Sequence, residues 1–173
     1  MVRTVLLLVF TLLALGGAAH AQVKTPQANQ VIETGKFRFY ETKQIRGEEE
    51  YTITGAAGDE LLVQAKTNMP FAEQDLKPLV NATLRTKKDS TPLTFEIKGP
   101  TLLDIEENTS VQVKGQLANI QDRGTNQTLK LPPVYFTLSG YVPVTMEMIL
   151  VRYWLIHDKS TSIPLFPRER RVR

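Results

Sequence analysis

Few residues of this chain could carry chemistry. It has two histidines, His20 and His157, and no cysteine. A protein metal site needs several convergent histidine, cysteine or carboxylate ligands, and nucleophilic catalysis needs a serine or cysteine beside a base. The sequence contains no H-x-H, H-x-x-H, C-x-x-C or G-x-S-x-G motif and no Gly-rich phosphate loop. We therefore assign no catalytic, metal-binding or cofactor-binding residue.

Two groups of charged residues still require an interpretation. The run Glu48-Glu49-Glu50 would alternate between the two faces of a strand, which favours a charged hairpin rim over an acidic site. The pair His157-Asp158 follows an apolar window, at the expected C-terminal end of a helix. Adjacent helix residues do not face each other, so this pair is no ready catalytic dyad. A structural or solvated role is the expectation for both groups.

The apolar window itself, 143–158, reads PVTMEMILVRYWLIHD and predicts the only long helix, with Thr145 as its N-cap. Its apolar residues cover nearly the whole circumference, which indicates a helix surrounded by protein. Glu147 and Arg152 are five residues apart, too far round the helix to pair with each other. We expect each to find a partner at the rim of the sheet. In the alternative, they line a ligand cleft with Tyr153 and Trp154.

Short stretches with period-two alternation and turn residues between them fill most of the remaining chain. They predict a mainly β fold: a curved antiparallel sheet or open barrel, wrapped around one buried C-terminal helix. Trp154 would then be enclosed by Phe37, Phe39, Phe95 and Phe136. The end of the chain, 168–173, resembles the start of another strand, so the sheet is expected to be incomplete and completed by self-association or by further sequence. The expected strands are 35–42, 49–54, 60–66, 79–86, 93–98, 101–106, 110–114, 117–122, 127–131 and 134–138.

The N-terminal residues have the pattern of a secretory signal. Arg3 precedes an apolar run, 5–15, which is too short to span a membrane, and Ala19-His20-Ala21 is an A-x-A cleavage site. The predicted organisation is a signal peptide at 1–21, a flexible lead-in at 22–33 and one β domain at 34–173. We expect an exported, periplasmic or extracellular protein without a stable membrane span. The complete absence of cysteine favours a bacterial envelope protein.

The charge distribution gives no support to a nucleic-acid partner. The whole chain has a formal net charge of +3. Arg3 leaves with the signal, and the last six residues, RERRVR, carry four arginines and one glutamate. The body of the domain between them is therefore close to neutral and slightly acidic. Nucleic-acid-binding domains instead carry a basic face.

Several fragments resemble the N-terminal β-rich region that precedes amidohydrolase-superfamily domains in secreted bacterial proteins. These fragments are GKFRFYETKQIRGEEEYTI, ATLRTKKDSTPLTFEIKG, and SGYVPVTMEMILVRYW followed by SIPLFP. The resemblance covers most of 35–167 and implies a downstream metal-dependent hydrolase barrel. None of that barrel's histidine ligands is present here, so no active-site residue carries over. The plan is also similar to uncharacterised periplasmic curved-sheet domains and, more distantly, to lipoprotein-carrier folds, which implies an apolar or glycan ligand.

Taken together, the sequence predicts a secreted, non-catalytic β domain. It would bind an apolar or envelope-derived ligand, or serve as the accessory module of a larger hydrolase. The alternative is a small secreted hydrolase of the amidohydrolase type, or a fragment of one. The low content of histidine and the lack of cysteine favour the first hypothesis.

Export predicts a defined mature N-terminus. Cleavage after Ala21 should leave Gln22 as the first residue of the exported protein. Intact-mass and N-terminal peptide analysis of the exported fraction checks this. Recovery of the chain with Met1 in the membrane pellet would contradict it.

Overall fold

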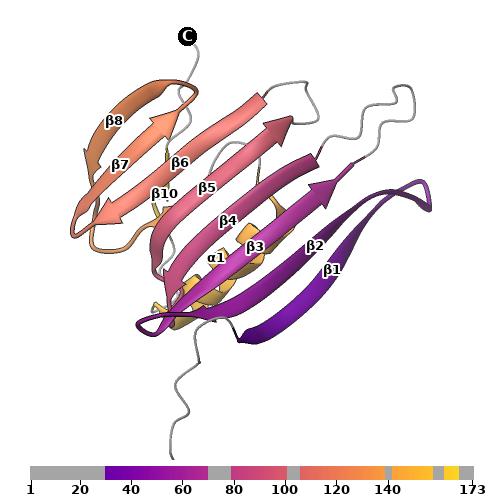
Figure 1. Ribbon diagram of the computed structural model, residues 1–173, viewed down its shortest axis with the longest axis horizontal. Coiled ribbons are helices and arrows are strands. Elements are labelled where there is room, and N and C mark those ends of the chain that lie inside the picture. The colour runs from indigo at the N-terminus through magenta and orange to yellow at the C-terminus, as the bar shows by residue number, and fades with distance from the viewer. Residues whose placement is uncertain (1–29, 70–78, 101–105, 139–141, 158–161, 168–173) are drawn as a thin grey trace, which may run out of the picture.

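The computed structural model describes residues 30–69, 79–100, 106–138, 142–157 and 162–167. Its main feature is an eight-stranded antiparallel sheet in which every strand pairs with its neighbour in the sequence (Figure 1). β1 and β8 form the two edges, and the sheet remains open. The strands are β1 (Val31–Glu41), β2 (Gln44–Ala56), β3 (Glu60–Asn68), β4 (Leu79–Lys87), β5 (Pro92–Pro100), β6 (Glu106–Lys114), β7 (Leu117–Asp122) and β8 (Thr125–Lys130).

Most strands occur where alternation predicts them, but several boundaries differ. The first turn is at Thr42 and Lys43, because both residues adopt positive φ (46° and 69°) and so form a tight two-residue hairpin. β2 therefore begins at Gln44, before the strand expected at 49–54. β6 continues through the turn expected at 107–109, where Thr109 is buried and pairs with Ile97. β1 begins at Val31, inside the expected lead-in. Residues 101–105, part of another expected strand, lie outside the described ranges.

The sheet buries only one of its faces. Along β3, β4 and β5 buried residues alternate with exposed or half-exposed polar ones, as in Ala82, Leu84 and Thr86 against Asn81, Thr83 and Arg85. This is the pattern of an antiparallel sheet with one solvated face. The strand residues of the core are Ile53, Val63, Ala65, Val80, Ala82, Leu84, Phe95, Ile97, Val111, Ala118 and Ile120.

Helix α1 (Val144–Ile156) lies across the buried face, behind the middle strands in Figure 1. Two short strands, β9 (Phe136–Thr137) and β10 (Leu165–Phe166), form a small parallel pair beside it. Within the strand expected at 134–138, only Phe136 and Thr137 have strand geometry. The mainly β, open antiparallel architecture with one C-terminal helix confirms the predicted fold class. In the described part of the chain, no helix has the length and hydropathy required to cross a bilayer.

The expectation that α1 is surrounded is wrong. Met146, Ile149 and Tyr153 are buried against the sheet, but Val151 and Leu155 are 53% and 52% exposed. The sheet curves past the helix without closing over it, so one layer of strands can cover only one side of a helix. The apolar circumference seen in the sequence therefore consists of an inner face in the core and an outer face in solvent.

Trp154 does not occupy the enclosed position expected of it. It is 36% exposed, whereas the neighbouring Tyr153 is 1% exposed and packs against Phe136 with ring centroids 5.5 Å apart. Successive helix residues are separated by about 100°. Burial of Tyr153 on the inner face therefore turns Trp154 away from the centre of the sheet, and Phe95 and Phe136 pack in the core without it.

Candidate functional site

The N-terminus of α1 is held by a buried carboxylate from the sheet. Glu49 of β2 is 0% exposed. Its Oε1 accepts hydrogen bonds from the Thr145 N–H (2.7 Å) and the Thr145 hydroxyl, and its Oε2 accepts one from the Val144 N–H (3.0 Å). The first N–H groups of a helix have no partner within the helix and lie at its positive dipole end. Glu49 thus caps a helix that begins 95 residues later in the chain.

The expectation of a charged rim at Glu48-Glu49-Glu50 is therefore correct for two of these residues and wrong for the third. Glu48 and Glu50 point outward and form ion pairs with Lys36. Glu49 points to the core, where the paired residue Thr67 on β3 donates its hydroxyl to Oε2 at 2.9 Å. The prediction that Thr145 is the N-cap is wrong, because Pro143 occupies that position. Thr145 instead lies in the first turn and donates its N–H and its hydroxyl to Glu49.

A second polar anchor joins the middle of the helix to the edge strand. The Arg152 guanidinium donates to both oxygens of Glu33, from Nη1 to Oε2 at 3.0 Å and from Nη2 to Oε1 at 2.9 Å. The Tyr51 hydroxyl donates to the same Oε1 at 2.8 Å. Hydrogen bonds from Arg152 and then Tyr51 hold the pKa of Glu33 below its usual value. Arg152 thus has a partner on the sheet, as expected.

Gly35 makes the approach of Tyr51 to Glu33 sterically allowed. Gly35 and Tyr51 are directly opposite each other on β1 and β2, and a Cβ at Gly35 would lie 2.5 Å from the tyrosine ring. Tyr51 therefore crosses over the glycine, with Phe37 stacked at a centroid distance of 5.6 Å. A glycine in a strand often marks such a close approach.

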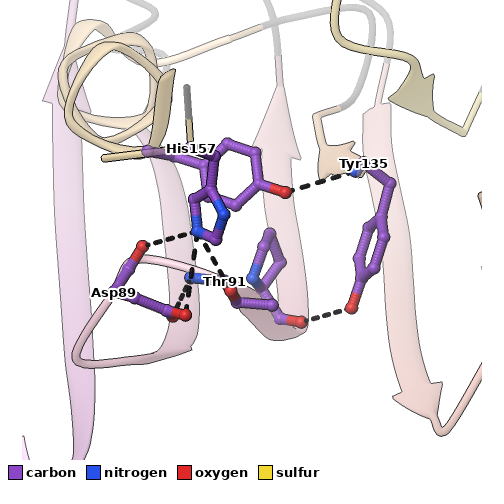
Figure 2. Close-up of polar contacts among 6 residues, drawn as sticks. Asp89, Thr91, Tyr135 and His157 are labelled. Atoms are coloured by element: carbon purple, nitrogen blue, oxygen red, sulfur yellow. Dashed lines mark hydrogen bonds and ion pairs between the residues drawn. The ribbon is translucent and has the colours of Figure 1, made fainter. Parts of the chain in front are cut away.

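The third anchor, at the C-terminal end of α1, is shown in Figure 2. The Nε2 atom of His157 lies 3.2 Å from the carbonyl oxygen of Asp89, 3.4 Å from the Thr91 hydroxyl and 3.7 Å from the Asp89 carboxylate. A carbonyl oxygen only accepts, so Nε2 carries a proton in this arrangement. The imidazole ring packs on Tyr153 with centroids 4.1 Å apart. The polar contacts of Nε2 are thus all with the β4–β5 turn.

The same anchor continues into the core through two tyrosines (Figure 2). The Tyr153 hydroxyl accepts from the Tyr135 N–H at 3.3 Å, and the Tyr135 hydroxyl donates to the Pro92 carbonyl at 3.1 Å. Burial raises the pKa of both tyrosines. At Asp89 burial opposes ionisation most strongly, but hydrogen bonds from Thr91 and the nearby His157 and Lys87 together lower its pKa.

The four residues considered for a ligand cleft lie on different sides of α1. Tyr153 is buried against the sheet and Arg152 is bound to Glu33. Glu147 is exposed on the outer side, and Trp154 is partly exposed. They line no common groove among those described. Glu33 and Glu49, which hold the helix, were not singled out as helix partners, because only the tertiary fold brings them to α1.

An apolar groove lies at the other end of the sheet. It has a volume of about 750 Å³ and opens between the end of β8, with the residues that follow it, and the strand β10. Hydrogen bonds from Leu131 N–H to the Gln116 carbonyl (2.8 Å) and from Leu138 N–H to the Phe166 carbonyl (2.7 Å) fix the chain segments on its two sides. The groove is lined by Gln116, Leu129, Lys130, Leu131, Pro132, Pro133, Pro164 and Phe166.

The composition of this lining determines what the groove could hold. Six of the eight residues are apolar, and three of those are prolines, which have no N–H to donate. Lys130 and Gln116 supply the polar side chains. Ligand sites of this volume are mostly apolar with a few polar groups that fix orientation. Pro164 lies 31 residues after Pro133 in the sequence, and only the tertiary fold brings the two to one groove.

The described residues contain no group of three or more His, Cys, Asp or Glu side chains placed to hold a metal ion. No protein-family model matches the chain, and neither curated proteins nor solved structures give a match. The candidate site is therefore argued from its geometry alone.

The cap at Glu49 gives a stability prediction with an internal control. Glu49→Gln keeps the shape but replaces one of the two acceptor oxygens by an NH₂ group, which then faces two of the four donors. It should lower the free energy of unfolding by about 3 kcal/mol, the scale for disrupting charge-assisted buried hydrogen bonds. Glu50→Gln removes a carboxylate from the adjacent, exposed position and should have little effect. Urea unfolding of both variants checks this, and equal losses would contradict the proposed cap.

The Arg152–Glu33–Tyr51 anchor gives a pH prediction. Because the folded pKa of Glu33 lies below its ordinary value of 4.5, this group stabilises the fold above about pH 4.5. That contribution is lost as the pH falls through the folded pKa. The acid-induced loss of stability should therefore shrink in Arg152→Met and, to a smaller extent, in Tyr51→Phe. Denaturant unfolding at neutral and at acidic pH measures this loss of stability for each variant. A larger reduction in Tyr51→Phe than in Arg152→Met would contradict the role given to Arg152.

Proposed function

We propose that this chain is an exported, non-catalytic binding domain that holds an apolar ligand in the groove between β8 and β10. The observation that carries the proposal is the groove itself, with six apolar residues and two polar ones around about 750 Å³. A ligand with an apolar body and an anionic or hydrogen-bonding end suits this lining. Its body would contact the prolines and leucines, and its polar end would meet Lys130.

The charge state of the groove supports an anionic end. No ion pair involves Lys130 among the described residues, whereas Lys36 is paired with Glu48 and Arg85 with Glu60 across neighbouring strands. An unpaired ammonium beside an apolar surface favours amphiphiles with a carboxylate or phosphate head. This narrows the sequence-based expectation of an apolar or glycan ligand to the apolar class.

Two other roles are compatible with the same domain. The resemblance to the region ahead of amidohydrolase domains implies an accessory module, whose groove would then receive part of a substrate or of the hydrolase. A hydrolase of the amidohydrolase type uses several histidine ligands, and His157 is the single histidine of the predicted mature domain. Its Nε2 atom is already directed to Asp89 and Thr91 (Figure 2), which favours the binding role.

Ligand binding can be tested with a fluorescent fatty acid, dansylamino-undecanoate, which has an apolar chain and a carboxylate. The wild-type protein should bind it saturably with one site per chain. Pro133→Glu places a charge in the exposed wall of the groove without touching the core, and it should weaken binding at least about tenfold, or 1.4 kcal/mol. Lys130→Gln should weaken binding of the carboxylate probe more than it weakens binding of the corresponding uncharged amide.

The matched control is Val151→Glu, the same kind of change on the exposed outer side of α1. It should leave the affinity for the probe unchanged. Absence of saturable binding to the wild type, or equal affinity in Pro133→Glu, would reject the groove as the ligand site.

A further inference from the structure

The outer side of α1 has the residue spacing of a helix–helix interface. Val144, Met148, Val151 and Leu155 are separated by four, three and four residues. At about 100° per residue these positions fall within a sector of about 60°, which forms one apolar stripe along the helix. Val151 and Leu155 are more than half exposed, and Val144 and Met148 are half-buried. We call these four residues the outer seam.

Most of the outer seam lies away from the face that packs on the sheet: Met148 also packs against the core, whereas Val151 and Leu155 are in solvent. Met146, Ile149 and Tyr153, which are buried in the core, lie on the opposite side of the helix. In heptad terms, the outer seam occupies the a and d positions, and the core face occupies b and f. Alternation of three and four between apolar positions is the pattern by which two helices interlock. A helix that served only the core would need no second apolar stripe.

We propose that two copies of this chain associate through the outer seam, with their α1 helices side by side and parallel. Each sheet would then cover the far side of its own helix, and the dimer would have the layers sheet, helix, helix and sheet. This proposal does not depend on the groove, which none of the seam residues lines.

The charged residues beside the outer seam specify a second copy and its orientation. With Val144 and Val151 at d, Glu147 is at g and Arg152 is at e. In parallel helix pairs a g residue faces the e residue of the partner five positions further on, which is the separation of Glu147 and Arg152. A parallel dimer would therefore form two Glu147–Arg152 contacts. In an antiparallel pair g faces g and e faces e, so neither charge would meet its opposite.

Both charged residues are accessible for this contact. Glu147 is exposed and takes part in no ion pair among the described residues. The Arg152 side chain is 39% exposed while it binds Glu33 through Nη1 and Nη2. The partner's carboxylate would approach the guanidinium from the solvent side. A membrane surface fits less well, because it favours several basic residues beside the apolar stripe, and here an acidic residue occupies one flank.

The short length of the seam is offset by the rigidity of the helix. Isolated helices of 13 residues are marginal in water, and a pair of them would lose most of its binding energy to ordering. Here Glu49, Glu33 and the Asp89–Thr91 turn already fix α1 at its start, middle and end. The seam is therefore presented in its bound conformation before any partner arrives.

Sedimentation velocity over a concentration series tests the association. The wild-type protein should show a reversible monomer–dimer equilibrium. Val151→Glu places like charges opposite each other at the centre of the seam and should raise the dimer dissociation constant at least about tenfold. Because Val151 is exposed, this variant should retain cooperative unfolding and probe binding in the groove. A wild type that stays monomeric throughout, or a dimer unaffected by Val151→Glu, would overturn the proposal.

The orientation can be tested by a disulfide, since the chain has no native cysteine. In a parallel pair the two copies of residue 151 face each other, so oxidised Val151→Cys should give a covalent dimer. Gln64→Cys, at an exposed position on the far face of the sheet, is the matched control and should not crosslink. Failure of Val151→Cys to crosslink in a protein that sediments as a dimer would overturn the parallel arrangement.

Discussion

The fold depends on a carboxylate buried between a strand and the start of a helix. Among the described residues, no basic side chain forms an ion pair with Glu49. It is stabilised by three donors from the first turn of α1 and by Thr67 on the adjacent strand. A buried carboxylate without such donors would be strongly unfavourable. The helix therefore cannot slide along the sheet or leave it without removing three hydrogen-bond donors from the buried Glu49 carboxylate.

This constraint explains how an open sheet supports a defined single-helix layer. An eight-stranded meander with one apolar face must cover that face, but a 13-residue helix can cover only part of it. The polar anchors determine which part. Glu33 and Glu49 fix α1 to β1 and β2, and the β9–β10 pair lies beside the helix. Hydrophobic burial is non-directional and would permit several helix positions, whereas these hydrogen bonds select one.

Two surfaces of different character result from this arrangement. The groove beside β10 is concave, with proline rings and leucines, and suits a small apolar ligand. The outer seam of α1 is a convex stripe with one acidic and one basic flank, and suits another helix. Their separation on the molecule means that ligand binding and self-association would be independent functions, and that a substitution at one surface serves as the control for the other.

The sequence by itself determined the local features of this protein. Alternation placed β3, β4, β5 and β7 almost at their final boundaries, and the apolar window 143–158 placed α1 within a few residues. These features depend on near neighbours in the chain. The tertiary structure alone decided which side of the helix is buried, because the sequence of a helix that is apolar all round does not indicate which face the sheet will cover. It also decided that Glu49 is a helix cap and not part of a charged rim, since the helix residues that donate to it lie 95 and 96 residues away. The groove has the same origin, because its walls come from segments that meet only when β10 folds back beside the end of β8.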